Sequence, residues 1–123
     1  MSAPILIVDD NDDNRKLLAW VLEDADLDYD EADSAEDALE KLRTSAHRAV
    51  LMDISLPGMQ GDEAIEVIRR DPALSKLPVV AVTAHALKGD TERIRARGAD
   101  AVLTKPVDEE RLIEVLMALI GES

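Results

Sequence analysis

Near its start the chain carries an apolar run that stops on two acids, Ile5-Leu6-Ile7-Val8-Asp9-Asp10. Three of its four apolar residues are β-branched, which favours a strand buried on both faces. Paired carboxylates at the end of such a strand repel each other and are costly to desolvate. A bound cation is the simplest compensation, so the run predicts a buried strand with a metal site at its end.

The rest of the chain alternates short strand-like runs with segments of helical periodicity. The predicted strands span residues 3–9, 28–32, 49–53, 78–83 and 101–104. Apolar residues recur at helical spacing after each strand, as around Leu22, Leu39, Ile65 and Leu116. This alternation predicts an α/β fold, a doubly wound five-stranded parallel sheet with helices on both faces.

Some local expectations are less regular. The first helix is predicted to bury a stripe that includes Leu17, with Trp20 off the stripe and partly exposed. Trp20 either anchors a partner or packs along the last helix. The fourth helix, residues 87–97, is weak because it contains Gly89 and few large apolar residues. We expect His47 to be a solvated loop residue.

Composition excludes several classes of function. The 123 residues, taken as one domain over 1–123, carry a net charge of -13, which disfavours nucleic acid and anionic membranes as partners. The absence of cysteine excludes disulfides and thiolate metal sites and fits a cytoplasmic protein. We recognise neither a signal peptide nor a membrane-spanning run in the sequence.

Four of the predicted strands end in chemically useful residues. Asp9 and Asp10 follow the first strand, Asp53 ends the third, Thr83 the fourth, and Lys105 follows the fifth. Parallel strands bring their carboxyl ends to one edge of the sheet, where ligands bind. If the first and third strands are neighbours, about 4.8 Å apart, their carboxylates can share one ion.

The residue types at this edge suggest roles. Hard oxygen ligands without His or Cys suit Mg²⁺, with Mn²⁺ as a second possibility. A metal ion and an ammonium group beside carboxylates suggest a phosphoryl ligand. One Asp can act as the nucleophile, since aspartyl phosphates are a known class of covalent intermediate. Thr83 can offer a hydroxyl group and Lys105 a positive charge to the phosphoryl oxygens.

Taken together, these pieces resemble the receiver domain of two-component response regulators, stand-alone or within hybrid histidine kinases. The resemblance covers essentially the whole chain, and its pieces occur in the family's order. They are Ile5-Leu6-Ile7-Val8-Asp9-Asp10-Asn11, Met52-Asp53, Leu56-Pro57-Gly58-Met59 with Gly61, Val82-Thr83-Ala84, and Lys105-Pro106. The resemblance implies the flavodoxin-like strand order 2-1-3-4-5.

The resemblance also implies a function, that of a phosphorylation-dependent signalling switch rather than a conventional enzyme. Asp53 would accept a phosphoryl group from phosphohistidine on a sensor histidine kinase or a histidine phosphotransfer protein. Asp9, Asp10, Asp53 and the backbone carbonyl of Ser55 would hold Mg²⁺. Thr83 and Lys105 would bind the phosphoryl oxygens. The family would assign modulating positions to Ser55, Ala84 and His85, and often has a cis bond at Lys105-Pro106.

One position departs from the family pattern. Many receivers carry Tyr or Phe three residues before the strand-five Lys, and that ring turns inward on activation. This sequence has Val102 there, which cannot reproduce the same movement. The helix at residues 87–97 is an alternative switch element, because weak local packing permits rearrangement.

Two other functions stay open at this point. A phosphorylation-independent receiver would serve as a protein-binding module. This alternative stays open because Val102 replaces the aromatic residue that moves on activation in many receivers. A phosphatase of the haloacid dehalogenase type would also use an Asp nucleophile and Mg²⁺, but it needs Asp-x-Asp where this chain has Asp9-Asp10-Asn11. Because no effector domain follows Ser123, we expect output through another protein or through return of the phosphoryl group to a histidine. The chain could also be part of a hybrid kinase or larger regulator.

Overall fold

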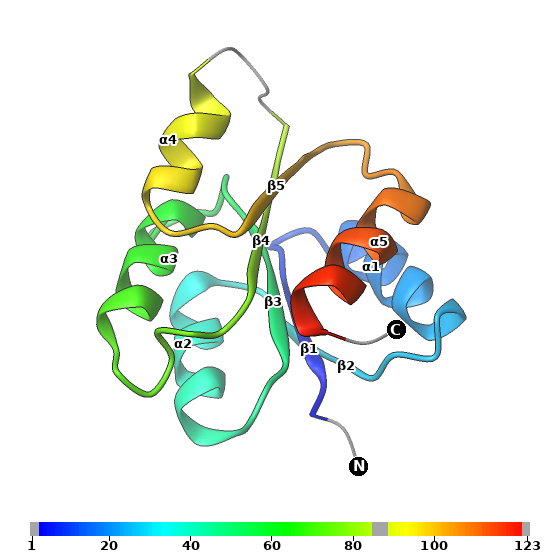
Figure 1. Ribbon diagram of the computed structural model, residues 1–123, viewed down its shortest axis with the longest axis horizontal. Helices are drawn as coiled ribbons and strands as arrows, with labels where there is room; N and C mark the ends of the chain where they lie inside the picture. Colours follow the sequence, from blue (N-terminus) through cyan, green and yellow to red (C-terminus); the bar gives the residue numbers. More distant parts are fainter. Residues whose placement is uncertain (1–2, 85–88, 122–123) are drawn as a thin grey trace.

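A computed structural model describes residues 3–84 and 89–121 of the chain. Its strands and helices alternate as predicted (Figure 1). The strands are β1 (Ile5–Val8), β2 (Tyr29–Ala32), β3 (Ala49–Asp53), β4 (Val79–Thr83) and β5 (Ala101–Thr104). The helices are α1 (Asp12–Asp24), α2 (Ala35–Thr44), α3 (Gly61–Arg70), α4 (Asp90–Ala96) and α5 (Glu109–Ile120).

The strands form one parallel sheet in the order β2-β1-β3-β4-β5, which confirms the predicted topology. Every residue of β1, β3 and β4 is buried, in keeping with their apolar sequences. At one edge, β2 is polar and only half-buried over most of its length. Since a sheet edge needs no second strand partner, its charged residues are tolerated there.

Helices cover both faces of the sheet. In Figure 1, α1 and α5 lie on one face, and α2, α3 and α4 lie on the other. Each layer seals its own apolar core. One core joins alternate residues of β1 and β3 to α1 and α5, and the other joins the intervening residues to α2, α3 and Ile94 of α4. This division follows from the two-residue repeat of a strand, which sends neighbouring side chains to opposite faces.

Side-chain caps start three of the helices. Asn11 accepts a hydrogen bond from the Asn14 N–H at 3.0 Å and so caps α1. Ser34 and Asp108 cap α2 and α5 through the same geometry. Each cap satisfies a backbone N–H that has no partner within its helix. The strands therefore pass into the helices through short, well-defined turns.

Two local predictions were wrong. Leu17 is 50% exposed instead of buried, because the inward face of α1 is filled by Leu18, Val21 and Leu22. The His47 side chain is fully buried rather than solvated; its ring nitrogens lie 3.0 Å from Asp30 Oδ2 and 3.3 Å from the Ser45 carbonyl oxygen. Asp30 belongs to β2, so this contact depends on tertiary folding and leaves no local sequence signal.

The fourth helix is shorter than the predicted segment 87–97. It begins after Gly89, which adopts a left-handed backbone conformation with φ of 97° at the N-cap. Leu87, one of the two large apolar residues of the predicted segment, lies outside the described residues. Gly98 also has positive φ just beyond the helix end, and its N–H donates to the Arg95 carbonyl oxygen, as a C-terminal capping glycine does.

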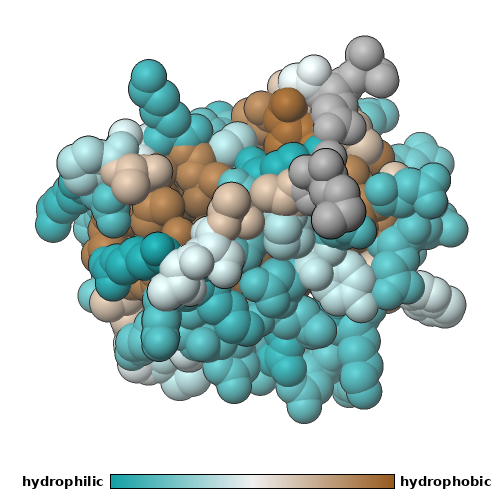
Figure 2. All heavy atoms as spheres, turned by 90° about the horizontal axis from the view of Figure 1, so that it is seen from below, coloured by the Kyte–Doolittle hydropathy of each residue, from teal (hydrophilic) through white to brown (hydrophobic). Residues whose placement is uncertain are grey.

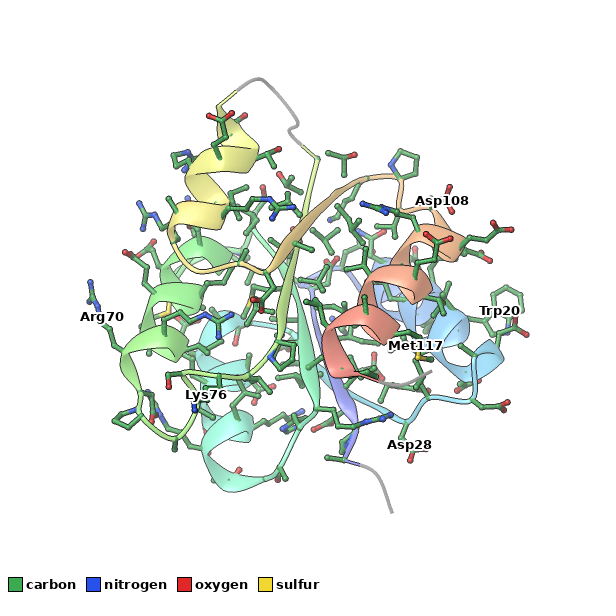
Figure 3. The ribbon with its side chains drawn as sticks, viewed as in Figure 1. Trp20, Asp28, Arg70, Lys76, Asp108 and Met117 are labelled. Atoms are coloured by element: carbon green, nitrogen blue, oxygen red, sulfur yellow. The ribbon has the colours of Figure 1, made fainter. Side chains whose placement is uncertain are left out.

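The surface reflects the composition. Figure 2 shows one face that is largely hydrophilic, with hydrophobic residues visible in smaller areas. Trp20 is 73% exposed, as predicted, and projects from α1 away from the body of the molecule (Figure 3). Among the described residues, none of the helices has the length and apolar character required to span a membrane.

The two leucine environments on α1 give a direct test of the packing. We expect Leu22→Ala to reduce the free energy of unfolding by about 2–5 kcal/mol, since Leu22 is completely buried. We expect Leu17→Ala to change it by less than about 0.5 kcal/mol. Urea denaturation of both variants measures the difference, and similar losses for the two would contradict the exposed position of Leu17.

Candidate functional site

The predicted site residues meet at the carboxyl edge of the sheet. Val8 of β1 pairs with Met52 of β3 at the end of their shared register, so Asp9 and Asp53 come next on two neighbouring strands. Asp9 and Asp53 are almost fully buried, as is Thr83 at the end of β4. Lys105 follows the end of β5. The parallel order of the strands therefore brings four separate parts of the chain to one place.

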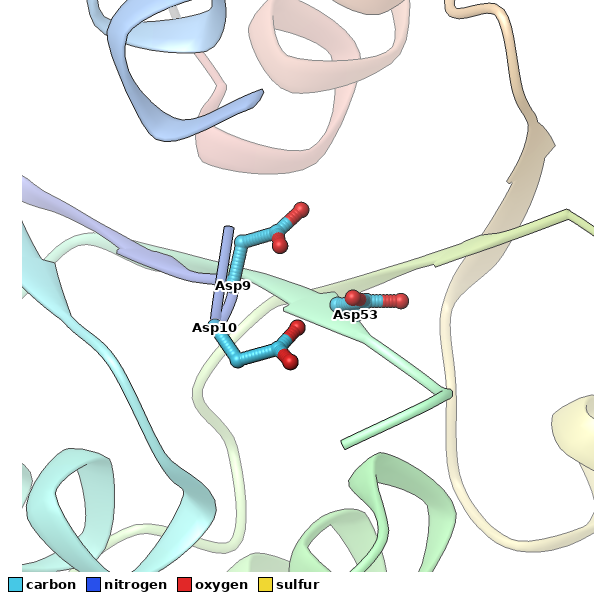
Figure 4. A group of neighbouring side chains, drawn as sticks. All are labelled: Asp9, Asp10 and Asp53. Atoms are coloured by element: carbon cyan, nitrogen blue, oxygen red, sulfur yellow. The ribbon is translucent and has the colours of Figure 1, made fainter. Parts of the chain in front are cut away.

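Three carboxylates form the centre of the site. One oxygen each from Asp9, Asp10 and Asp53 can be chosen so that all three lie within 4.8 Å of one another. Figure 4 shows Asp9 and Asp10 projecting from the end of β1 on the side where Asp53 ends β3. Asp10 is exposed, so the cluster is open to solvent on that side. Three hard oxygen donors this close together fit Mg²⁺.

Lys105 supplies the positive charge of the site. Its Nζ lies 3.4 Å from Asp53 Oδ2 and 3.5 Å from Asp9 Oδ2. The Lys105 backbone N–H donates to the Thr83 carbonyl oxygen at 2.8 Å, which ties the end of β5 to β4. The Lys105-Pro106 bond is cis, as expected from the resemblance. One ammonium group thus faces both buried carboxylates.

Asp9 is held by the turn that joins β1 to α1. Its Oδ1 accepts a hydrogen bond from the Asn11 N–H at 2.9 Å. Its backbone carbonyl accepts a hydrogen bond from Arg15 Nη1 at 2.7 Å, and Arg15 Nε also reaches Glu31 at 3.2 Å. Arg15 was missed by the sequence analysis, because a basic residue in a first helical turn gives no sign that it bonds backwards to a strand end.

Asp53 is positioned by a close backbone approach. The Ser55 N–H donates to Asp53 Oδ1 at 3.2 Å. Gly61, the first residue of α3, donates its N–H to the Ile54 carbonyl oxygen at 3.0 Å. A Cβ on Gly61 would lie 2.0 Å from the Asp53 carbonyl oxygen, which is far inside van der Waals contact. Glycine is therefore required at this position if α3 is to pack against the end of β3.

A cleft opens above these residues. Its volume is about 490 Å³, and its walls include Ser55 and Thr83, with Asp10 at its acidic side. Three residues of α4, namely Asp90, Arg93 and Ile94, also line the cleft. None of the three was predicted from the sequence to be a site residue. A cleft of this size leaves room for a phosphoryl group and a metal ion beside Asp53.

The remaining predicted positions lie around the cleft. Ala84 is exposed directly after Thr83, whereas His85 lies outside the described residues. Val102 is half-buried on β5 and packs against the core beneath α3 and α4. Its backbone pairs with Ala81 of β4. Val102, which stands where many receivers carry an aromatic residue, therefore lies on the face of the sheet that α4 covers.

The electrostatics of Asp53 are unfavourable to its charged form. Burial raises the pKa of the Asp53 carboxyl above its usual value, and the nearby negative charge of Asp9 raises it further. The Lys105 ammonium and the Ser55 N–H act in the opposite direction but do not cancel the rise in pKa. An Asp53 carboxylate in this setting is favoured by any added cation.

This raised pKa predicts a stability change in Asp53→Asn. The folded state binds the Asp53 proton more tightly than the unfolded state does. The protonated Asp53 carboxyl therefore stabilises the fold at low pH, and this stabilisation is lost as the pH rises through the pKa of the folded state. We therefore expect Asp53→Asn to be more stable than the wild type at pH 7 without metal, by roughly 1 kcal/mol. The difference should vanish below about pH 4.

Urea denaturation across this pH range, with a chelator present, measures the effect. Added Mg²⁺ should stabilise the wild type more than Asp53→Asn, because the variant lacks one of the three carboxylates. A variant less stable than the wild type at pH 7 would contradict the proposed repulsion.

Comparisons with known proteins agree with this geometry. Residues 5–117 match the family described as "Response regulator receiver domain". The polar-differentiation response regulator DivK of Brucella ovis is 37% identical over 123 residues, which is the full length of both chains. A response regulator structure from Chloroflexus aurantiacus superimposes with a TM-score of 0.94 at 27% identity, covering 99% of this chain and 100% of the other.

A further solved structure bears on the acidic cluster. The receiver domain of a sensor histidine kinase from Pseudomonas aeruginosa, with a magnesium ion coordinated in its active site cleft, superimposes with a TM-score of 0.90. It is 29% identical, and the match covers 99% of this chain and 100% of that one. With the family match over nearly the whole chain, these likenesses show that the protein belongs to the response regulator receiver domains of two-component signalling.

Proposed function

We propose that the protein is a cytoplasmic phosphoacceptor switch in which Asp53 receives a phosphoryl group from a phosphohistidine donor. The observation that carries the proposal is the position of Asp53. It is a nearly buried carboxylate that lies with two further acids and one ammonium group. The two residues that follow it, Ile54 and Ser55, line an open cleft. The donor would be a sensor histidine kinase or a histidine phosphotransfer protein, and phosphorylation would alter binding of an output protein.

Mg²⁺ is the cofactor that the site fits. Asp9, Asp10 and Asp53 would hold it through one oxygen each, and the backbone carbonyl of Ser55 would add a fourth ligand. The magnesium ion in the Pseudomonas aeruginosa receiver supports this assignment. When bound, the ion would supply positive charge to the phosphoryl oxygens and relieve repulsion among the carboxylates. The oxygen ligands would also accept Mn²⁺.

The transfer would proceed at a carboxylate oxygen of Asp53. This oxygen attacks the phosphorus atom, the P–N bond to the donor imidazole breaks, and the imidazole leaves with the bonding electron pair and is protonated. Lys105, already 3.4 Å from Asp53, would neutralise charge on the phosphoryl oxygens. The Thr83 hydroxyl would donate a hydrogen bond to one of them.

Hydrolysis would end the signal. Water attacks the phosphorus atom, the P–O bond to Asp53 breaks, and inorganic phosphate leaves with the carboxylate restored. Ser55 lies in the cleft wall, and Ala84 follows the buried Thr83, so both positions would influence the path of this water. His85 is assigned the same modulating role on the resemblance alone. The domain would support its own phosphorylation and dephosphorylation without turning over an external substrate.

The second candidate is a receiver that binds partners without phosphorylation. Val102 favours it, because an aliphatic residue on β5 cannot rotate inward as an aromatic ring does. Phosphorylation chemistry does not need that ring, however, and the clustering of Asp9, Asp10 and Asp53 with Lys105 beside Asp53 supports the first proposal. A phosphatase of the haloacid dehalogenase type is the third reading, and it predicts turnover of phosphate esters.

Mass spectrometry of the intact protein tests the first proposal. Treatment with acetyl phosphate and Mg²⁺ should add one phosphoryl group to the wild type and none to Asp53→Asn. Omission of Mg²⁺ should abolish the adduct. Absence of any adduct at short times, in folded protein with Mg²⁺ bound, would instead favour the binding module, and steady hydrolysis of a phosphate ester would favour the phosphatase.

A second prediction concerns Lys105. We expect Lys105→Ala to slow the appearance of the adduct by about 100-fold, because the charge that faces Asp53 is lost. Lys76→Ala is the matched control, since this exposed lysine lies in the turn between α3 and β4 (Figure 3). That turn precedes β4 and so lies at the amino ends of the strands, away from the site at their carboxyl ends. Quenched time courses of the intact mass provide the rates. Equal rates for both variants would remove Lys105 from the proposed chemistry.

A further inference from the structure

Asp62 is a buried carboxylate that the phosphoryl site does not use. It is the second residue of α3 and only 4% exposed. Its Oδ1 accepts a hydrogen bond from the Glu63 N–H at 3.0 Å. Its Oδ2 lies 3.5 Å from Arg93 Nη1 and 3.6 Å from Arg97 Nε, both on the α4 side. A buried charge requires such compensation, so two arginines share one carboxylate.

The two arginines are held unequally. Arg97 Nη1 forms a hydrogen bond of 2.7 Å with Glu66 Oε1 in addition to its contact with Asp62. Arg93 makes two contacts of 3.5 Å, to Asp62 and to Asp90, which are longer than an ordinary charge-assisted hydrogen bond. Its side chain is also 54% exposed. Arg93 is therefore the looser of the two partners of Asp62.

Arg93 also faces the phosphoryl site. It lines the same 490 Å³ cleft as Ser55, Thr83 and Asp10. Its guanidinium thus contacts both Asp90, which lines the cleft, and the buried Asp62. A phosphoryl group on Asp53 would add negative charge to the cleft side and leave the Asp62 side unchanged.

We propose that Arg93 is a phosphoryl-binding residue of this receiver, which exchanges its carboxylate partners Asp62 and Asp90 for the phosphoryl oxygens on Asp53. This inference rests on the proposed function of Asp53. A guanidinium matches phosphate oxygens with two parallel N–H donors, a better geometry than its two long contacts with separate carboxylates. Asp62 remains paired with Arg97 when Arg93 moves to the phosphoryl group, so the buried carboxylate is not left without a positively charged partner.

Beryllium fluoride, a tetrahedral mimic of an aspartyl phosphate, provides the test in the full chain. With Mg²⁺ present, we expect Arg93→Ala to bind beryllium fluoride about 3- to 10-fold more weakly than the wild type. In the absence of fluoride, its affinity for Mg²⁺ should be equal or higher, because a cation has been removed from an acidic cleft. A purely structural role of Arg93 would lower both affinities together.

Arg95→Ala is the matched control. Arg95 lies on the same helix and carries the same charge, but its contact is the Asp100 carbonyl oxygen and it does not line the cleft. Both titrations are monitored by the amide chemical shifts in NMR spectra. We expect this variant to match the wild type in the Mg²⁺ titration and in the beryllium fluoride titration. Asp62→Asn, which removes a competing anion, should bind beryllium fluoride more tightly, and Arg93→Lys should recover part of the loss.

The outcomes separate the two proposals. If the wild type binds beryllium fluoride and forms the acetyl phosphate adduct while Arg93→Ala and Arg95→Ala behave alike, Arg93 is not a phosphoryl ligand and the assignment of Asp53 stands. If the wild type shows neither binding nor adduct, the proposed function fails first and this inference falls with it. Should Arg93→Ala fail to fold, Arg93→Gln replaces it in the same titrations.

Discussion

The site depends on the apposition of Asp9 and Asp53 with a single ammonium group between them. Two nearly buried carboxylates on neighbouring strands repel each other and lose hydration, and the resulting rise in the pKa of Asp53 is not cancelled by Lys105. The protein therefore holds an uncompensated negative charge where a cation fits. A bound divalent cation would relieve this electrostatic cost, which is the physical basis for the proposed metal and phosphoryl site.

The sheet makes that apposition possible. Pairing of β1 with β3 in parallel register places the residues after Val8 and Met52 side by side. The apolar strands are buried on both faces by the two helical layers, so the carboxyl edge is the part of the sheet free to carry polar chemistry (Figure 1). Gly61 then allows the start of α3 to lie directly against the backbone of Asp53 and Ile54.

The contacts around α4 suggest how a receiver without an aromatic residue on β5 can remain responsive. Val102 gives that strand a small aliphatic side chain beneath α4. Arg93 and Arg97 connect α4 to the buried Asp62 of α3, and Arg93 also reaches the cleft. An ion pair shared between two acidic regions responds to added charge in either of them, whereas an apolar contact does not.

The sequence by itself determined the strand-helix alternation, the ends of β3 and β5, and the acids and lysine of the site. These features are local: apolar runs, helical periodicity and a polar residue at a strand end need no knowledge of neighbours. Only the tertiary structure decided the partners. Arg15 bonds back to Asp9, and His47 is buried against Asp30, because folding brings distant segments together. The exposure of Leu17 and the pairing of Arg93 with Asp62 were settled in the same way, by which helix faces meet.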